Sequence, residues 1–256
     1  MPVECAYEGP VALLTLSRSE VMNAVSREML DRLGDHLDSI ECNPELRAIV
    51  ITGEGRAFSA GADVEAMKDF SALEARAFAQ RGHELANRIE SFPKPVVAAV
   101  NGFALGGGCE VALSCDIRLL SEKAKLGLPE LKLGIMPGWG GTQRLARLTN
   151  PSYAKDLIFT GRMVDADEAR RMGLANQVHP AGALIDAAMA LAGEISARPP
   201  WAISTSKEMV NLALEGDLQG HLARELDAFA LAFTTEDARE GISAFLEKRE
   251  ARFTGR

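Results

Sequence analysis

The chain has 256 residues and a formal net charge of −8, and this acidic balance argues against a surface built to bind nucleic acid. Its 47% hydrophobic and 25% charged residues are typical of a globular protein with a sizeable core, so a small molecule is the expected partner. The four cysteines show no metal-ligand spacing and no secretory leader is apparent, so we expect a cytoplasmic protein without a metal site.

The first 120 residues alternate apolar runs with helical patterns. Short apolar runs predict strands over residues 11–16, 47–52, 95–100 and 117–120. Apolar residues at helical spacing, or a composition rich in Ala, Leu, Glu and Arg, predict helices over 26–40, over 72–91 and from Gly106 onward. Ser26 is expected to cap the first of these helices. The weakly charged stretch 95–115 contains Asn101 and Glu110, so we interpret it as buried strand and helix, not as a membrane span.

The second half begins with a glycine-rich loop over 125–142 that is too long to be a simple connection and is therefore expected to be functional. Helices are then expected over 151–160, 166–172 and 184–196, followed by a helical tail from residue 203 to residue 250. Pro199 and Pro200 break the pattern, so we place a boundary between a core of residues 1–199 and a helical region of residues 200–256.

Apolar residues at spacings of three and four give this tail one apolar face. The face packs either on the tail's own domain or against another subunit. Its residues are Leu214, Leu218, Leu222, Leu226, Phe229 and Phe233.

Residues 101–110 lead from a strand through three glycines into a helix. Without Cβ atoms on Gly106–Gly108, a ligand can approach the unpaired N–H groups of the helix N-terminus, which predicts an anion hole. Glu110 follows Gly107 by three residues on the same helical face, so a donor and a carboxylate would point into one cavity. A glycine-lined helix packed closely on a sheet is the alternative interpretation.

Two other segments complete the candidate site. In residues 56–63 small side chains flank Gly61 just after a strand, which fits a second donor loop or a simple turn. Glu130 has apolar neighbours in sequence, and burial among them would favour its neutral form and allow it to donate a proton near pH 7. The helix dipole at Glu110 favours the carboxylate, so the two groups would form an acid and base pair unless Glu130 lies at the surface.

Together these segments resemble the enoyl-CoA hydratase/isomerase, or crotonase, family over nearly the whole chain. The resemblance implies an α/β, crotonase-like (ClpP/crotonase) spiral of β-β-α turns, a C-terminal helical trimerisation region, and a homotrimer or dimer of trimers. Its active site would lie in the core of residues 1–199. The motifs that carry the resemblance are residues 18–24, 57–63, 101–110, 127–130, 134–145 and 240–249.

The resemblance also implies an activity. Glu110 and Glu130 match the two catalytic glutamates of the hydratases, which favours a hydro-lyase that adds water reversibly and syn to a 2-trans-enoyl-CoA to give a 3-hydroxyacyl-CoA. Such an enzyme serves the degradation of fatty acids or related acyl-CoA thioesters. No cofactor is implied, because coenzyme A is part of the substrate.

Individual roles follow from the same resemblance. The N–H groups of Ala62 and Gly107 would bind the thioester oxygen, and the backbone of Gly138 would help to hold the water. Glu110 would activate that water and Glu130 would supply the proton to C2. Contacts with coenzyme A are implied for Val21, Met22, Ala24, Ala60, Ala62, Asp63 and Val64, and for Phe245 and Lys248 of a neighbouring subunit.

Three other functions stay open at this point. A 3,2-enoyl-CoA isomerase or another crotonase chemistry such as thioester hydrolysis would use one carboxylate, and a non-catalytic acyl-CoA-binding or RNA-binding oligomer would use neither. Leu128 stands where many short-chain hydratases carry Gln, so the motif does not fix the acyl chain.

Overall fold

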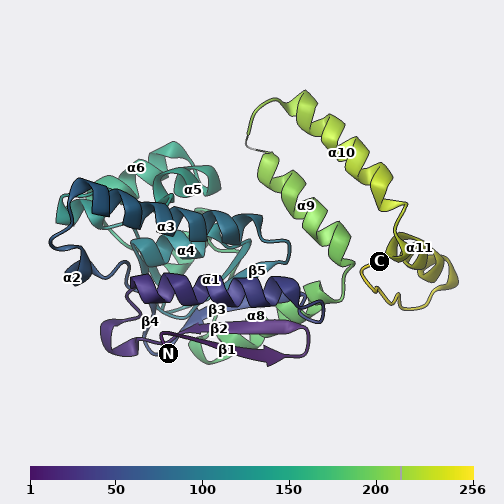
Figure 1. Cartoon of the computed structure of the whole chain (residues 1–256), viewed down its shortest axis with the longest axis horizontal. Coiled ribbons are helices and arrows are strands. Elements are labelled where there is room, and N and C mark those ends of the chain that lie inside the picture. The colour runs from purple at the N-terminus through teal and green to yellow at the C-terminus, as the bar shows by residue number, and fades with distance from the viewer. Residues whose placement is uncertain (214) are drawn as a thin grey trace.

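The computed structural model describes residues 1–213 and 215–256, and its core is built on two sheets (Figure 1). In the larger sheet β1 and β2 pair antiparallel, and the strands from β2 onward pair parallel. Its strand order is β1 (Val3–Glu8), β2 (Val11–Leu16), β3 (Ala48–Gly53), β5 (Val96–Val100), β7 (Ile117–Ser121) and β10 (Gln177–His179). The smaller sheet has the order β4 (Ala57–Ser59), β6 (Phe103–Leu105), β8 (Lys125–Gly127) and β9 (Val164–Asp165).

The chain winds between the two sheets as a repeated unit. Each turn adds one strand to the larger sheet and the next strand to the smaller sheet, and a helix then closes the turn. The three successive turns are β3, β4 and α3 (Ala72–Ser91), then β5, β6 and α4 (Gly107–Ser114), then β7, β8 and α5 (Gly141–Leu148). This arrangement confirms the predicted spiral of β-β-α turns.

The middle strands β3 and β5 of the larger sheet are buried on both faces, as is usual for parallel strands. Alternate residues of β3 point to opposite faces. Ile49 and Ile51 join the main core, whereas Val50 packs in a second cluster against α8 (Leu184–Ser196). The main core also takes the apolar face of α1 (Arg27–Cys42), where the Ser26 side chain accepts a hydrogen bond from the Met29 N–H at 3.2 Å as predicted.

The long elements lie close to their predicted bounds, and the short ones were missed. The predicted helices over 72–91, 151–160 and 184–196 correspond to α3, α6 (Pro151–Thr160) and α8, and the one over 166–172 to α7 (Ala166–Arg171). The loop over 125–142 contains β8 and a 3-10 turn. Besides β1 and the strands of two or three residues, the elements not predicted are α5 (Gly141–Leu148), η1 (Ser19–Val21), α2 (Val64–Met67), η2 (Glu130–Leu133) and η3 (Ala181–Ala183).

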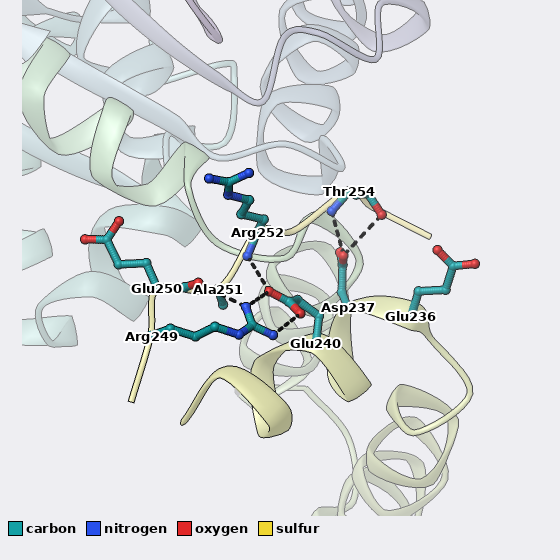
Figure 2. A pocket seen from close by; sticks show the side chains of 8 residues that line it. All are labelled: Glu236, Asp237, Glu240, Arg249, Glu250, Ala251, Arg252 and Thr254. Carbon is teal, nitrogen blue, oxygen red and sulfur yellow. Dashed lines mark hydrogen bonds and ion pairs between the residues drawn. The ribbon is translucent and has the colours of Figure 1, made fainter. Parts of the chain in front are cut away.

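Three helices form the tail, and they stand apart from the sheets at one side of the molecule (Figure 1). They are α9 (Pro200–Leu212), α10 (Leu218–Ala232) and α11 (Glu236–Glu247). The last residues fold back on α11, where Asp237 accepts a hydrogen bond from the N–H group of Thr254 (Figure 2). Asp237 also accepts one from the N–H group of Gly255. Glu240 also binds the Arg249 guanidinium, so the C-terminus is fixed to the tail by carboxylates.

The predicted apolar face of the tail does not pack on its own domain. Leu226 is 71% exposed and Phe229 is 66% exposed, and Leu218, Leu222 and Phe233 are exposed as well. Leu214, the sixth predicted member, lies outside the described residues. Among the described helices, none combines the length and the apolar character needed to cross a bilayer.

Candidate active site

One cavity of about 700 Å³ collects the sequence-predicted segments, although they are far apart in the chain. Its walls come from the loop after β4, the first turn of α4, the turn η2, the loop before α5 and one face of α3. The residues of interest in its lining are Ala60, Gly61, Ala62, Val64, Gly106, Gly107, Glu110, Glu130, Gly138 and Trp139.

Two glycine-containing turns bring backbone N–H groups to this cavity. The loop after β4 is held against the segment before α1, because the Val25 N–H donates to Gly61 O at 2.7 Å and the Asp63 N–H donates to Val25 O at 3.1 Å. This leaves the Ala62 N–H between them. Gly106 has φ 50° and ψ −129°, a conformation that favours glycine, and it turns the chain into α4 so that Gly107 begins the helix.

Within the described part of the chain, neither the Ala62 N–H nor the Gly107 N–H donates a hydrogen bond to another group. The two loops lie close together, because a Cβ added to Gly61 would lie 3.7 Å from the Gly107 nitrogen. A Cβ added to Gly107 would lie 2.6 Å from the Trp139 ring, so a side chain there would displace that wall. The arrangement can bind an oxygen that carries partial negative charge.

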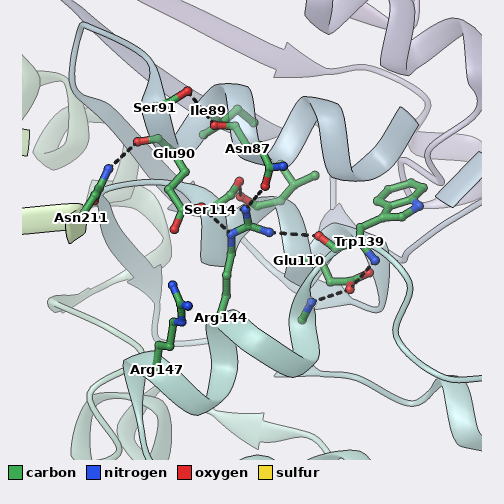
Figure 3. Close-up of polar contacts among 12 residues, drawn as sticks. Asn87, Ile89, Glu90, Ser91, Glu110, Ser114, Trp139, Arg144, Arg147 and Asn211 are labelled. Atoms are coloured by element: carbon green, nitrogen blue, oxygen red, sulfur yellow. Dashed lines mark hydrogen bonds and ion pairs between the residues drawn. The ribbon is translucent and has the colours of Figure 1, made fainter. Parts of the chain in front are cut away.

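Glu110 lies in the first turn of α4 and only 2% of its surface is exposed. Its Oε1 accepts hydrogen bonds from the N–H groups of Trp139 and Gly141, each at 2.7 Å (Figure 3). Burial raises the pKa of Glu110, while the two amides and the charge of Arg144 oppose this effect. The carboxyl is therefore held in one orientation by the backbone, through one of its two oxygens.

Glu130 begins η2 and lines the same cavity. Both of its carboxyl oxygens are buried, and neither has a hydrogen-bond partner among the described residues. Gly106 lies against it, since a Cβ on Gly106 would be 3.1 Å from Glu130 Oε1. Burial raises the pKa of Glu130 to about 7, and the nearby Glu110 carboxylate adds to this effect. Near neutral pH the group can both give and take a proton.

One expectation about these carboxyls needs correction. The helix dipole at Glu110 was expected to favour its charged form while burial favoured the neutral form of Glu130. In the structure burial raises the pKa of both groups, because Glu110 is also removed from water. What distinguishes them is hydrogen bonding, since Glu110 accepts two amide donors and Glu130 accepts none within the described chain.

The residues expected to contact coenzyme A fall into three groups. Ala60, Ala62 and Val64 line the cavity. Four more residues lie outside the lining but close to it, namely Val21, Met22, Ala24 and Asp63. The Ala60 N–H donates to Met22 O at 2.9 Å, and Arg18 Nη1 donates hydrogen bonds to Ala24 O and to Asp63 Oδ2. Phe245 and Lys248, at the end of α11, are not part of the cavity, and Phe245 is 81% exposed.

Sequence reasoning missed two residues that shape the site. Trp139 is 3% exposed, forms a wall of the cavity and contributes an N–H to Glu110. Arg144 is 7% exposed and reaches the Trp139 carbonyl at 3.1 Å. A bulky aromatic residue inside a glycine-rich loop was an available signal for Trp139. No such signal pointed to Arg144, because an arginine in an amphipathic helix usually faces solvent.

No group of three or more His, Cys, Asp or Glu side chains among residues 1–213 and 215–256 is arranged to hold a metal ion. All four cysteines are free thiols, and burial raises the pKa of Cys109, next to Glu110, to about 12. The cavity itself is lined by two carboxyls, Glu110 and Glu130, and by the two loops that carry the N–H groups of Ala62 and Gly107, which are unpaired within the described residues.

Comparison with known proteins gives a consistent result. A family model described as enoyl-CoA hydratase/isomerase matches residues 6–256. The short-chain-enoyl-CoA hydratase of Clostridium acetobutylicum is 44% identical over 244 residues, which cover 95% of this chain and 94% of that protein. The 2,3-dehydroadipyl-CoA hydratase of Escherichia coli is 41% identical over 248 residues, 96% of each chain. A crystal structure of an enoyl-CoA hydratase from Bacillus anthracis superposes with a TM-score of 0.96 at 36% identity, over all of both chains.

Proposed function

Because the chain belongs to the enoyl-CoA hydratase/isomerase family, we propose that Glu110 and Glu130 add water across the double bond of its substrate. The chain is an enoyl-CoA hydratase, a hydro-lyase that acts on an acyl-CoA thioester. The observation that carries the proposed roles is the pair of buried Glu130 oxygens, which have no partner in the described chain and face the cavity that Glu110 also lines.

The two backbone donors supply the electrostatic part of the reaction. When water attacks C3 of a 2-trans-enoyl thioester, negative charge develops on the carbonyl oxygen. We place that oxygen between the N–H groups of Ala62 and Gly107, which form no other hydrogen bond within the described residues. Loss of one such donor typically costs about 3 to 4 kcal/mol of transition-state stabilisation.

The two carboxyls carry out the proton transfers. Glu110 is held through Oε1, so its second oxygen is available to orient the water and accept its proton. Glu130, with a pKa of about 7, delivers a proton to C2 on the same face, which gives syn addition and a 3-hydroxyacyl-CoA. The Gly138 backbone lies in the same wall and is proposed to hold the water.

The presence of both carboxyls in one cavity favours hydration over the alternatives. A 3,2-enoyl-CoA isomerase moves one proton between two carbons and needs a single carboxylate, as does thioester hydrolysis. A non-catalytic acyl-CoA-binding or RNA-binding oligomer has no use for two buried carboxyls, which are costly to keep out of water.

We further propose that the chain assembles as a homotrimer or a dimer of trimers through its tail. The exposed apolar face of α10 has no cover among residues 1–213 and 215–256, and exposed apolar patches mark interaction sites. In such an assembly Phe245 and Lys248 would reach the cavity of a neighbouring subunit and meet coenzyme A there. Lys248 would bring positive charge to an acidic chain that binds an anionic substrate.

The cellular setting is part of the same proposal. Hydration needs only water, the substrate and the two carboxyls, so no cofactor beyond the coenzyme A of the substrate is expected. Four free thiols are typical of a reducing compartment, which supports a cytoplasmic location. The reaction places the enzyme in the degradation of fatty acids or related acyl-CoA thioesters.

The test is an absorbance assay on a panel of 2-trans-enoyl-CoA thioesters, starting with crotonyl-CoA, which lose their conjugated chromophore on hydration. Glu110→Gln and Glu130→Gln should each lower kcat by about 10² to 10⁴, because each removes a positioned acid or base. Glu122→Gln, at an exposed glutamate, is the matched control and should leave kcat unchanged. Full activity in either cavity variant would favour a one-carboxylate mechanism instead.

A further inference from the structure

The loop that holds Glu110 is itself held by one buried arginine of α5. Arg144 Nη1 donates a hydrogen bond to Trp139 O at 3.1 Å, and the N–H of the same tryptophan donates to Glu110 Oε1 at 2.7 Å (Figure 3). A single residue therefore stands between the guanidinium group and the carboxyl. Arg144 does not line the cavity, so any effect that it has on the reaction passes through this loop.

The rest of the guanidinium group is bound to α3. Nη2 donates to Asn87 Oδ1 and to Glu90 Oε2, each at 2.7 Å, and Nε donates to Glu90 Oε2 at 3.2 Å. Charged hydrogen bonds of this kind, made by a planar group with fixed donor directions, are strong and directional. Arg144 thus ties the loop before α5 to a long helix of the core.

The tail helix α9 joins the same network. Asn211 Nδ2 donates to the Glu90 backbone carbonyl at 2.9 Å (Figure 3). Lys207, one turn earlier in α9, binds Ile89 O at 3.1 Å and Asp116 Oδ2 at 2.8 Å. The end of α3 that anchors Arg144 is therefore fastened to the tail at two points.

We propose that Arg144 is a positioning residue for hydration. It fixes the turn over residues 139–141, so that the two amides of this turn hold Glu110 Oε1 and leave the other carboxyl oxygen directed at the reacting water. The proposal rests on the role proposed above for Glu110. A displacement of about 1 Å in such a group can lower the rate about 10²-fold, although the substrate still binds.

Arg144 also acts on Glu110 through its charge. The ionisable groups around Glu110 are Glu130 from η2, Cys109 from α4, Arg144 from α5, and His83 of α3, which lies beside Gly140. Among these Arg144 is the cation that lowers the pKa of Glu110. Its removal should raise that pKa, so the acid limb of the pH profile of kcat/KM should move to higher pH.

The test compares Arg144→Gln with Arg147→Gln, a change on the same helix. Arg147 is an exposed residue whose ion pair with Glu215 has a distance of 3.2 Å, and its loss removes a charge without touching the loop. Both variants, the wild type and Glu110→Gln are assayed with crotonyl-CoA from pH 5 to pH 9. The wild type and Glu110→Gln are measured first, so a failure of the proposed function appears there, whereas a failure of the present inference appears in the Arg144 and Arg147 variants.

For Arg144→Gln we expect kcat to fall about 10²-fold with KM within about threefold of wild type, and the acid limb to move to higher pH. Arg147→Gln should match the wild type. Arg144→Lys keeps the positive charge but loses the planar guanidinium group with its fixed donor directions. It should therefore lower kcat without moving the acid limb of the pH profile, a combination that a purely structural role would not predict.

The proposal is overturned if Arg144→Gln keeps wild-type kcat. It is also overturned if the variant loses activity with no shift of the acid limb, or if Arg147→Gln loses as much. If Arg144→Gln does not fold, Arg144→Lys decides: a fall of about fivefold or more in kcat at unchanged KM supports the proposal, and wild-type kcat overturns it.

Discussion

Gly141 donates its backbone N–H to Glu110 Oε1 at 2.7 Å, and a Cβ on Gly141 would lie 2.9 Å from that same oxygen. The contact links α5 to the first turn of α4, 31 residues earlier in the chain. There is no space for a side chain at position 141, because an added Cβ would also lie 2.9 Å from Leu128 Cδ1.

Gly141→Ala should therefore damage catalysis more than binding. The added methyl group forces Glu110 or the loop to move, which should lower kcat about 10²-fold and cost about 1 to 3 kcal/mol of unfolding free energy. The measurements are steady-state kinetics with crotonyl-CoA and denaturation in urea. Gly193→Ala in α8, where a Cβ meets nothing within 4 Å, is the control and should keep wild-type kcat. Equal kcat in the two variants would show that close packing at Gly141 does not position Glu110.

The stability of the protein should depend on pH through Glu130. Its pKa of about 7 in the folded chain exceeds its ordinary value of 4.5, so folding favours the protonated form. The stabilising contribution is therefore complete below about pH 4.5 and is lost as pH rises through 7. The loss is at most about 3 kcal/mol, and less where water reaches the carboxyl.

Glu130→Gln isolates this effect because the amide cannot ionise. Between pH 5 and pH 8 the variant should gain stability relative to the wild type by about 2 to 3 kcal/mol, while its activity is lost. Urea denaturation of both proteins at a fixed protein concentration measures the difference. An advantage that does not change with pH would show that Glu130 is charged, or already paired, throughout this range.

Much of the fold could be predicted because long elements repeat their pattern often enough to be seen. α3 spans Ala72–Ser91, and its predicted bounds were the same, since Ser71 starts a capping box and a proline follows the helix closely. The strands β4, β6 and β8 have three residues each, fewer than an alternating pattern needs, and two of them border glycine turns. Their pairing is fixed by contacts between successive turns of the spiral, which no local pattern contains.

Some residues of the site could likewise be predicted from the sequence and others could not. The pattern of residues 101–110 predicts a helix N-terminus that a ligand can approach, and Glu130 can be identified as a carboxyl with apolar neighbours in sequence. The role of Arg144 could not be predicted, because its partners Asn87 and Glu90 lie more than fifty residues earlier and meet it only in the folded chain. The expectation for Glu110 considered the helix dipole alone, and burial, which acts in the opposite direction, raises the pKa of this group.

The Trp139 ring should transmit changes on α3 to the catalytic carboxyl. A Cβ on Gly82 would collide with this ring, which also packs edge-on against Phe78 with ring centroids 5.5 Å apart. Gly82→Ala should push Trp139 and its N–H away from Glu110, lowering kcat and costing about 1 to 3 kcal/mol of stability by overpacking. In Gly34→Ala on α1, where a Cβ meets nothing within 4 Å, the better helix propensity of alanine should raise stability by about 0.5 to 1 kcal/mol. A Gly82→Ala enzyme with wild-type kcat would show that the ring does not guide Glu110.

The apolar face of α10 should decide both assembly and substrate affinity. Phe229 is 66% exposed and stacks edge-on with Phe233, with ring centroids 5.3 Å apart, so Phe229→Asp places a charge in the middle of the face. Sedimentation should then show a species near the chain mass of 27.5 kDa in place of a trimer or hexamer. If Phe245 and Lys248 serve a neighbouring subunit, the same variant should raise KM for crotonyl-CoA.

Tyr7→Asp is the matched control for this change, because Tyr7 is an aromatic residue that is 56% exposed on β1, outside the tail. It should alter neither mass nor KM. A wild-type chain that sediments as a monomer would remove the proposed assembly outright. Separation of the subunits takes both Phe245 and Lys248 away from any neighbouring cavity. A monomeric Phe229→Asp variant with unchanged KM would therefore support the proposed assembly of the wild type but show that coenzyme A is bound within one chain.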